Sequence, residues 1–593
     1  MKKLGKAILG LVAAVAMLVT GLVAPLTAVA AGEYHITIGT DAKPVTSEHT
    51  FQAYQVFKGD LSKDETTLSN IDWGTGVIGS ELLTALKSDA EFGTTFADVT
   101  TAAQAAGKMD AQFDAAAFAK IVAKYLDQTS GNGSFKNGKY TISGLDAGYY
   151  LIKDKDNTLG NKTEAYTEFI LKVVKNIDGV AAKADVPTVE KKVKDTNDSE
   201  TVANDPNDDQ WSDSADHDIY DLVDYKLTGT LPSNYASYTE GYTYKFTDTL
   251  SKGLTVQDGK NDKEVKHSTA VKSENSIHVY AVNPDAAGSY TSENATKVEI
   301  ADATNAQDKT TGYEVSVKSY DKNGTEVETS DSDYWTKVDH HVMTINFANL
   351  KNVTKSASDT SDTALTIDAK TQIVVEYKAQ LNTHATVGET GNPNEVKLTF
   401  SNNPNHEGEG TPTGDTPEDK VTVFTFELNA TKVDSAGNEK IGATFSLYKW
   451  NKNSSQYDLV DTIAGTGSSK FTFSGLDAGQ YKLVEDQAPD TYNKMPDKEF
   501  KIVAVHNATS DDPKLTSLKF TDLNGTEIPS TDEYFQVQTT TDAGKPNVNI
   551  VNYKGSELPS TGGMGTVILY ALGAAFVAAA GAWFAFRRRL SNC

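Results

Sequence analysis

The chain has 593 residues, of which 55 are lysine or arginine and 81 are aspartate or glutamate, so its formal net charge is −26. So acidic a surface excludes a role in nucleic-acid binding and suits a soluble extracellular protein. The only cysteine is Cys593, at the end of the chain. Disulfide bonds therefore cannot brace a fold of this length.

The N-terminus has the organisation of a secretory signal. Three lysines among the first six residues precede an apolar stretch, and Ala28-Val29-Ala30 follows as a small-x-small cleavage site. We therefore predict a signal peptide over residues 1–30, in preference to an uncleaved membrane anchor. The exported body, of roughly 530 residues, is long enough for three or four domains.

Residues 31–182 are predicted to form a first β domain. Apolar residues alternate with polar ones in its expected strands, which are 36–38, 51–57, 139–142, 149–152 and 169–174. Between 102 and 127 the apolar residues recur at helical spacing in an alanine-rich background. We therefore expect one helix inserted in an otherwise β domain.

Two further β regions follow, at 183–423 and 424–557. The first is loop-rich, and its strongly acidic segment 195–218 is expected to be a solvated loop. The second has short, evenly spaced strands with turn signals, a pattern typical of a β-sandwich. The sequence Ser-Gly-Leu-Asp-Ala-Gly occurs at 143–148 and again at 474–479, each time before a strand. We therefore expect the first and third domains to share a fold.

The C-terminal end carries three signals in order. Leu558, Pro559, Ser560, Thr561 and Gly562 form an LPXTG motif, an apolar run over 567–586 follows, and three arginines end it. The pentapeptide alone is also compatible with a surface turn. The apolar run is long enough to predict a transmembrane segment with its arginines on the cytoplasmic side. Together the three signals resemble the sorting signal of Gram-positive sortase substrates.

Further motifs extend this resemblance to essentially the whole chain. They are Ala53–Asp60, Pro187–Val193, Tyr244–Leu250, Gly391–Val396 with Phe400–Asn403, and Leu428–Asp434. In this order they resemble Gram-positive LPXTG-anchored major (backbone) pilins of the SpaA/SpaH type. The resemblance implies an all-β chain of tandem immunoglobulin-like β-sandwich domains, of collagen-adhesin B, A and B type in turn. It also implies self-formed isopeptide bonds between lysine and asparagine.

Such a bond sets clear chemical requirements. A neutral lysine amine attacks the side-chain amide of asparagine and ammonia leaves, so the lysine pKa must be lowered by burial. A protonated Asp or Glu beside both groups polarises the amide and shuttles the proton, and burial raises its pKa accordingly. All three side chains must therefore point into the core from neighbouring strands.

The third domain offers Lys432, Glu485 and Asn552 for this chemistry. Lys432 shares a strand face with Leu428 and Ala430, because side chains alternate with period two. Glu485 and Asn552 likewise share faces with apolar residues of their strands. We predict a crosslink between Lys432 and Asn552, promoted by Glu485.

The middle domain offers a second set. Val189, Lys191 and Val193 share a face, so Lys191 is expected to point inward. The resemblance places the acid at Asp248 and the asparagine at Asn394. The sequence leaves alternatives open, which are Lys192 for the lysine, Asp221 or Asp224 for the acid, and Asn402 for the asparagine.

The first domain departs from the pattern. Asp154 stands where Glu485 stands in the third domain, but the inward face of its first strand carries no lysine. We therefore expect no crosslink there and interpret Asp154 as a surface acid.

Polymerisation by a sortase requires an acceptor amine. In backbone pilins this is a lysine near the end of the first domain, in a Tyr-Pro-Lys-Asn-like motif that this chain lacks. Lys183 stands in the corresponding place, eight residues before Lys191, and Lys175 is the alternative.

The resemblance thus predicts a structural pilus subunit on the cell wall. Thr561 would be joined to a neighbour's lysine and finally to the wall. The implied partners are a pilin-polymerising sortase, a housekeeping sortase, identical subunits and peptidoglycan, with minor pilins and host ligands left open. A monomeric wall-anchored adhesin or minor pilin is the alternative function.

We expect no enzyme activity beyond autocatalytic crosslinking, no cofactor and no metal site, since no phosphate loop or zinc-type spacing is present. An anchored hydrolase would need a catalytic group that the sequence does not supply.

Overall fold

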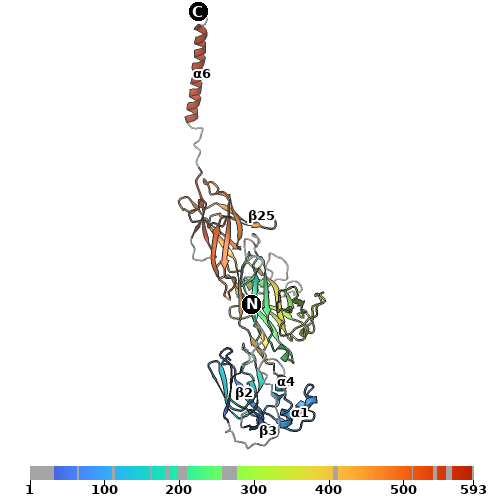
Figure 1. Ribbon diagram of the computed structural model, residues 1–593. Coiled ribbons are helices and arrows are strands. Elements are labelled where there is room, and N and C mark those ends of the chain that lie inside the picture. The colour runs from blue at the N-terminus through green and yellow to red at the C-terminus, as the bar shows by residue number, and fades with distance from the viewer. Residues whose placement is uncertain are drawn as a thin grey trace.

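The computed structural model of the protein is elongated, with three β domains in succession along its length (Figure 1). It describes residues 32–590 except 63–65, 110–113, 160–162, 181–185, 197–198, 200–209, 257–276, 405, 407–411, 511, 539–543 and 556–563. Each of three hydrophobic cores draws on one continuous part of the chain, at 34–173, 193–423 and 424–550. We call these parts the first, middle and C-terminal domains. The predicted signal peptide, Lys183 and the LPXTG motif lie outside the described residues.

The first domain packs two four-stranded sheets against each other. One has the order β4-β5-β1-β8 and the other β3-β2-β6-β7. The strands are β1 (Tyr34–Ile38), β2 (Phe51–Leu61), β3 (Leu68–Trp73), β4 (Asn132–Lys136), β5 (Lys139–Leu145), β6 (Gly148–Asp154), β7 (Glu168–Val173) and β8 (Ile177–Val180).

Helices lie between β3 and β4 of this domain. The sequence predicts a single helix over 102–127, but the structure has two short helices there and two before them. They are α1 (Gly79–Ser88), α2 (Gly93–Phe96), α3 (Ala102–Ala106) and α4 (Ala115–Val122). The side chain of Thr101 caps the start of α3 by accepting from the amide of Gln104, and Gly107 follows its last residue. These local capping signals give α3 its own start and end, although the apolar spacing predicted one continuous helix over 102–127.

The middle domain contains two seven-stranded sheets. One follows β10-β9-β12-β19-β15-β16 with β14 beside β19, and the other β11-β22-β20-β13-β18-β17 with β21 beside β20. The strands are β9 (Val189–Lys194), β10 (Trp211–Ser212), β11 (Ser214–Asp216), β12 (Leu222–Gly229), β13 (Tyr244–Ser251), β14 (Leu254–Val256), β15 (Ile277–Asn283), β16 (Thr296–Glu299), β17 (Glu314–Tyr320), β18 (His340–Phe347), β19 (Gln372–Leu381), β20 (Asn392–Ser401), β21 (Thr413–Asp415) and β22 (Asp419–Phe424). A short helix, α5 (Tyr334–Lys337), precedes β18.

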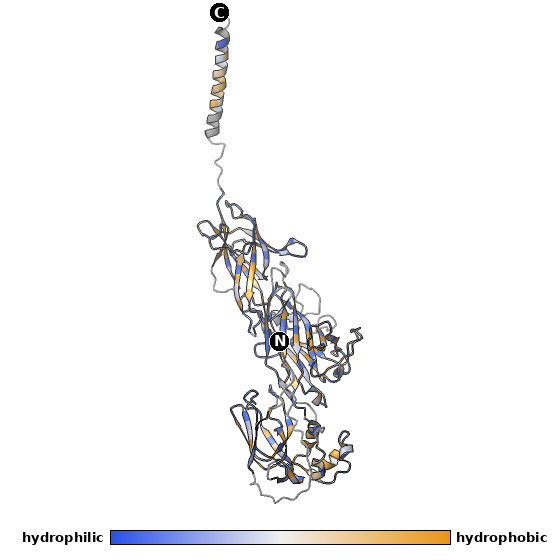
Figure 2. Cartoon of the chain, viewed as in Figure 1, coloured by the Kyte–Doolittle hydropathy of each residue, from blue (hydrophilic) through white to orange (hydrophobic). Residues whose placement is uncertain are grey.

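The C-terminal domain is a sandwich of the sheets β26-β23-β31-β30 and β25-β24-β27-β28-β29. Its strands are β23 (Phe426–Asp434), β24 (Thr444–Asn451), β25 (Gln456–Ala464), β26 (Lys470–Leu476), β27 (Gly479–Gln487), β28 (Lys498–His506), β29 (Leu515–Thr521), β30 (Phe535–Gln538) and β31 (Asn547–Asn552). Hydrophobic and hydrophilic residues alternate along these strands, as Figure 2 shows. The predicted all-β class is therefore confirmed.

The first and C-terminal domains are built in the same way. Tyr34 pairs with Leu145 just as Phe426 pairs with Leu476, with a register shift at the next residue in both. In each domain the first strand also pairs in parallel with a strand near the domain's end. The repeated hexapeptide occupies the equivalent turn in both, which explains why it recurs in the sequence.

The last helix, α6 (Met564–Leu590), lies beyond the C-terminal domain. Among the described residues, no helix has the length and apolarity needed to cross a membrane. This contradicts the transmembrane segment predicted at 567–586.

Candidate crosslinking sites

Lys191, Asp248 and Asn394 meet in the core of the middle domain. Each is fully buried. Lys191 lies on β9 of one sheet, whereas Asp248 and Asn394 lie on the adjacent strands β13 and β20 of the other. Asn394 stands opposite Leu250, two residues from Asp248, so both side chains leave the same sheet face. The group therefore bridges the two sheets.

Tyr377, on β19, completes this group. The Lys191 amine donates to Asp248 and, over 3.1 Å, to the Tyr377 hydroxyl. The hydroxyl in turn donates to Asp248 Oδ2 over 2.6 Å and accepts from Asn394 Nδ2 over 2.7 Å. The sequence motifs did not identify Tyr377. The one available signal is that its hydroxyl lies on a strand face whose other residues are apolar.

Burial sets the electrostatics of the middle site. It lowers the pKa of the Lys191 amine, and the neighbouring Asp248 only partly offsets this effect. Burial, together with Asp248, raises the pKa of Tyr377 well above its usual value, so the hydroxyl keeps its proton. Lys191 also lies over the rings of Tyr225 and Tyr377, which stack on each other. Burial thus favours the neutral, nucleophilic form of the amine.

Lys432, Glu485 and Asn552 meet in the core of the C-terminal domain. Lys432 and Asn552 are fully buried and Glu485 is 3% exposed. Lys432 pairs with Ile550 across parallel strands β23 and β31, which places Asn552 one same-face position further along. Glu485 faces them from β27 of the opposite sheet. Asn552 Nδ2 lies 2.9 and 3.0 Å from the two carboxylate oxygens of Glu485.

The pKa shifts at this second site have the directions that the chemistry needs. Burial lowers the pKa of Lys432 to about 8, against the opposing effect of Glu485. Burial raises the pKa of Glu485, although hydrogen bonds from the Met495 amide and from Asn552 partly offset it. The Lys432 amine donates to the carbonyls of Val433 and Ile550 over 3.0 and 2.8 Å. Burial thus makes the Lys432 amine easier to deprotonate and the Glu485 carboxyl easier to protonate.

The two asparagines have a feature in common, which Asn234 and Asn402 also show. Within the described residues, Oδ1 of Asn394 and Oδ1 of Asn552 are buried without a hydrogen-bond partner. A buried carbonyl without a donor is costly. Rotation of the Asn552 amide by half a turn would place Oδ1 against Glu485, where a protonated carboxyl can donate to it. Such a contact polarises the amide for attack.

The alternatives from the sequence analysis have other surroundings. Lys192 points away from the core and pairs with Asp213 and Glu190. Asp221 pairs with His217, and Asp224 pairs with Lys378. Asn402 is buried, but its amide donates to the carbonyls of Leu159 and Glu164 in the first domain. The structure therefore brings together Lys191, Asp248 and Asn394 rather than any of these.

The interpretation of Asp154 as a surface acid is wrong. Asp154 is 1% exposed and accepts from His49 Nδ1 over 2.8 Å and from the Thr167 amide over 2.9 Å. Burial alone would lower the His49 pKa, but Asp154 and Glu164 outweigh it and raise that pKa to about 9. Asp154 and Glu485 hold equivalent register positions, opposite Phe51 and Phe445. The first domain thus has an ion pair where the C-terminal domain has the lysine and asparagine.

The acidic segment is also not simply a solvated loop. Asp195, Asp213 and Asp216 are buried, because this part of the middle domain packs against the C-terminal domain. Two groups there have metal-ligating side chains within 4.8 Å of one another, namely Asp195 with Asp216 and His506, and Asp218 with Asp221 and Asp477. Basic side chains of the protein already contact both groups. His506 lies 3.3 Å from Asp216, and Lys449 lies between Asp218 and Asp477.

Two family models match the chain. One is described as the SpaA prealbumin-like fold domain and matches residues 426–522, which hold Lys432 and Glu485. The other is described as the LPXTG cell wall anchor motif and matches residues 550–590. The protein is therefore a surface protein anchored to the cell wall.

Known proteins of similar sequence and structure include pilins. The trypsin-resistant surface T6 protein of Streptococcus pyogenes serotype M6 is 26% identical over 268 residues, which cover 36% of this chain and 48% of that protein. The match thus spans about half the length of that relative. The solved T6 backbone pilin is 18% identical with a TM-score of 0.45, covering 90% of this chain and all of that one. The major pilin SpaA of Corynebacterium diphtheriae is 12% identical with a TM-score of 0.38, covering 88% and 100%. The family models confirm two parts of the resemblance, which are the LPXTG anchor and a SpaA-type domain.

Proposed function

We propose that the protein is the structural backbone subunit of a covalently polymerised surface pilus, stabilised by two self-formed isopeptide bonds. The observation that carries the proposal is the pair of buried lysine, acid and asparagine groups in the middle and C-terminal domains. Burying an amine beside an amide and an acid costs folding free energy, since each unpaired polar group loses its hydration. A domain that replaces this group with a covalent bond removes that cost.

Each bond forms by the same balanced step. The neutral amine of Lys191 attacks Cγ of Asn394, a carbon–nitrogen bond forms, and the asparagine nitrogen leaves as ammonia. Asp248 receives a proton from the amine and delivers one to the leaving nitrogen, so it is regenerated. Lys432, Asn552 and Glu485 follow the same course. No cofactor or metal takes part, and the protein turns over no external substrate.

The two bonds constrain their domains differently. Lys432 and Asn552 lie on the first and last strands of the C-terminal domain, so their bond joins the ends of that domain. Lys191 lies on the first strand of the middle domain, but Asn394 lies on β20, and β21 and β22 follow it. The middle bond therefore joins the two sheets of that sandwich.

In the fibre, a pilin-polymerising sortase joins Thr561 of one subunit to Lys183 of the next, and a housekeeping sortase attaches the last subunit to peptidoglycan. Lys183 lies at the proposed boundary between the first domain, 31–182, and the middle domain, 183–423. The C-terminal domain, 424–557, ends just before the sorting signal. Minor pilins and host ligands are further partners of such a fibre.

Immunoblots of cell-wall extracts test this proposal. Wild-type protein gives a ladder of high-mass bands that survives boiling in detergent, and Lys183→Ala collapses it to the monomer. Lys175→Ala is the matched control and keeps the ladder. A wild-type monomer band without a ladder would instead establish the alternative, a monomeric adhesin or minor pilin. A ladder that persists in Lys183→Ala would transfer the acceptor role to another lysine.

A further inference from the structure

The repeated hexapeptide forms a contact surface in the C-terminal domain. Its turn, Ser474–Gly479, faces the middle domain. The amide of Ile219 donates to the carbonyl of Gly475 over 3.0 Å. The amides of Asp477 and Ala478 donate to the carboxylates of Asp218 and Asp216 over 3.0 and 2.5 Å. The turn thus binds two carboxylates through consecutive backbone amides.

This contact is closely packed. A Cβ added at Gly475 would lie 2.1 Å from the side chain of Ile219. Lys449 ties the same junction together by pairing with both Asp218 and Asp477. In the C-terminal domain, therefore, the hexapeptide turn is filled by the preceding domain.

Among the described residues, no other domain packs against the same turn in the first domain, although Gly32 lies beside it. Gly144 has a φ of 79°, matching the 80° of Gly475, and Tyr150 donates to the carbonyl of Asp146 as Tyr481 does to that of Asp477. However, nothing lies within 4 Å of a Cβ added at Gly144. Within the described residues, the amides of Asp146 and Ala147 have no hydrogen-bond partner. The two backbone amides that bind carboxylates in the C-terminal domain thus have equivalents in the first domain that bind no described group.

This turn lies at the end of the first domain that faces away from the middle domain. β6 begins beside the turn and ends at Asp154, and the loop after it reaches the middle domain, where the Tyr166 amide donates to the Asn402 carbonyl over 2.8 Å. The turn is tied to the start of β1, since the Gly32 amide donates to Asp146 over 2.6 Å. In Figure 1 the first domain forms the end of the molecule opposite α6.

A neighbouring subunit has the reach to fill this turn. The chain leaves the first domain at Val180, beside Gly39 and hence at the other end of β1, and Lys183 follows three residues later. From Gly555 to Thr561 the neighbour's chain spans at most about 20 Å. β1 with its flanking residues, from Gly32 to Ile38, is also about 20 Å long. A Thr561–Lys183 joint therefore allows the neighbour's C-terminal domain to lie level with the turn.

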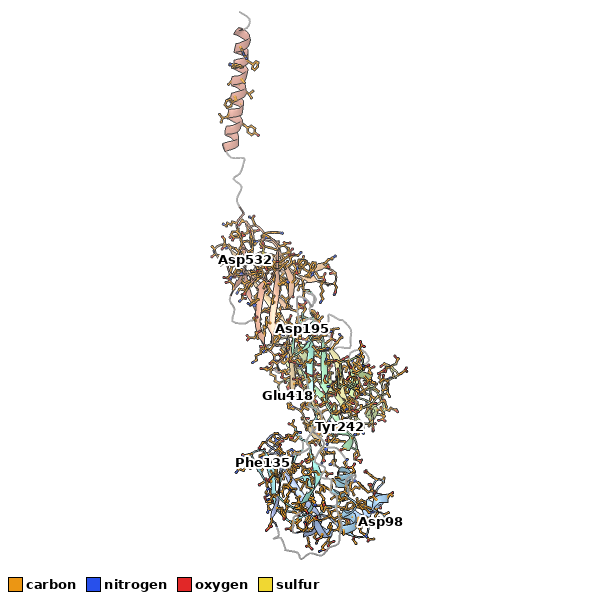
Figure 3. The ribbon with its side chains drawn as sticks, in the orientation of Figure 1. Asp98, Phe135, Asp195, Tyr242, Glu418 and Asp532 are labelled. Atoms are coloured by element: carbon orange, nitrogen blue, oxygen red, sulfur yellow. The ribbon has the colours of Figure 1, made fainter. Side chains whose placement is uncertain are left out.

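That domain presents carboxylates where its chain departs. The loop 489–497 packs on the departing chain, because the Asn493 amide donates to Tyr553 and the Gly555 amide donates to Thr491. Asp490 and Asp497 on this loop are exposed. Neither carboxylate has a partner among the described residues. Figure 3 shows the C-terminal domain bearing Asp532 at the opposite end of the β domains from Phe135 and Asp98 of the first.

We propose that the hexapeptide turn of the first domain is a docking site for a second copy of this chain. The amides of Asp146 and Ala147 bind a carboxylate of the neighbour's 489–497 loop, as the equivalent amides bind Asp218 and Asp216 within one molecule. The interface rests on the proposed function, because the Thr561–Lys183 joint brings the two copies together.

Engineered cysteines test this contact, since Cys593 lies beyond the sorting motif and the rest of the chain has no cysteine. In fibres carrying Ala147→Cys with Thr491→Cys or Pro496→Cys, which adjoin Asp490 and Asp497 and are exposed, oxidation should yield a disulfide-linked peptide that joins the first and C-terminal domains of adjacent subunits. The matched control is Asn137→Cys with the same partners, because Asn137 lies near Tyr140 at the other end of β5 and should give none. A gel of the same sample run under reducing conditions shows whether the subunits are still joined in a ladder once the disulfides are broken.

A second measurement needs no cysteine. Hydrogen exchange of peptides covering 143–148 should slow at least tenfold in wild-type fibres compared with Lys183→Ala monomers, and Asp490→Asn/Asp497→Asn fibres should lose this protection. A normal ladder with neither disulfide nor protection would reject the docking site while the pilin proposal stands. Absence of any ladder would reject both.

Discussion

The hydroxyl of Tyr377 and the carboxyl of Asp248 lie 2.6 Å apart, and the same hydroxyl accepts from Lys191 and Asn394. A tyrosine hydroxyl has one proton to donate and two lone pairs to accept with. Here all three are used, so Tyr377 fixes the mutual orientation of the nucleophile, the acid and the amide. We interpret it as a positioning residue for the middle crosslink.

Tyr377→Phe should slow formation of the middle crosslink at least tenfold without abolishing it. The variant keeps the ring that stacks on Tyr225 but loses the hydroxyl that orients Asn394. Intact mass, followed over time after synthesis, would show one ammonia loss at the normal rate and the second delayed. The delay should lessen as pH rises, because more of the amine is then neutral.

Tyr244→Phe is the matched control for that change. Tyr244 is buried in the same core, and its hydroxyl donates to a backbone carbonyl, that of Thr230, over 2.8 Å. It should cost stability by the loss of one hydrogen bond, about 1 kcal/mol, and leave both ammonia losses at the wild-type rate. Equal delays in the two variants would mean that Tyr377 acts only through packing.

The two acids should control their crosslinks independently. Wild-type protein should weigh less than its processed sequence by two ammonia molecules, and Asp248→Asn or Glu485→Gln by one. Loss of the Lys432–Asn552 bond frees a loop of about 120 residues, which should lower the free energy of unfolding by about 5 kcal/mol. Peptide mapping would identify the missing crosslink. An unshifted wild-type mass would refute the crosslinks altogether.

The first domain should lose stability as pH rises. The pKa of His49 is about 9 when folded, against about 6.5 in an unfolded chain. Its stabilisation is therefore complete below about pH 6.5 and disappears as pH rises through about 9, by about 3 kcal/mol. Calorimetry should show that the melting temperature of the first domain, which we expect to melt first, falls as pH rises over this range. Asp154→Asn, which removes the main partner of His49, should flatten the profile.

When the molecule is pulled at Lys183 and Thr561, the two crosslinks should carry the force in place of most of the chain between them. With both crosslinks present, the load passes from Lys191 to Asn394 and from Lys432 to Asn552, so the segments between each pair cannot extend. Single-molecule pulling on the wild-type protein should show no unfolding of either segment. Glu485→Gln should release about 120 residues, or ~400 Å of chain. A release of that size in wild-type protein would contradict the bond.

The local patterns predicted that Lys191 and Lys432 point into the cores, and they failed where tertiary packing decides. Alternation with period two is enough to direct Lys191 and Lys432 inward, because a one-residue shift would expose each strand's apolar set. Asp154 was misinterpreted because its partner, His49, lies about a hundred residues away in the sequence. Tyr377 was missed for the same reason, since a strand face shows that a side chain is buried but not what its polar tip meets.

The sequence by itself determined the all-β class, the repeated domain, the anchor motif and the inward direction of Lys191 and Lys432. These follow from strand periodicity and short motifs, which act over a few residues. Only the tertiary structure decided that the middle group spans two sheets, that Tyr377 joins it, and that Asp195, Asp213 and Asp216 of the acidic segment are buried. These depend on contacts between strands far apart in the chain. The same applies to the two hexapeptide turns, which are alike in sequence and differ in what lies against them.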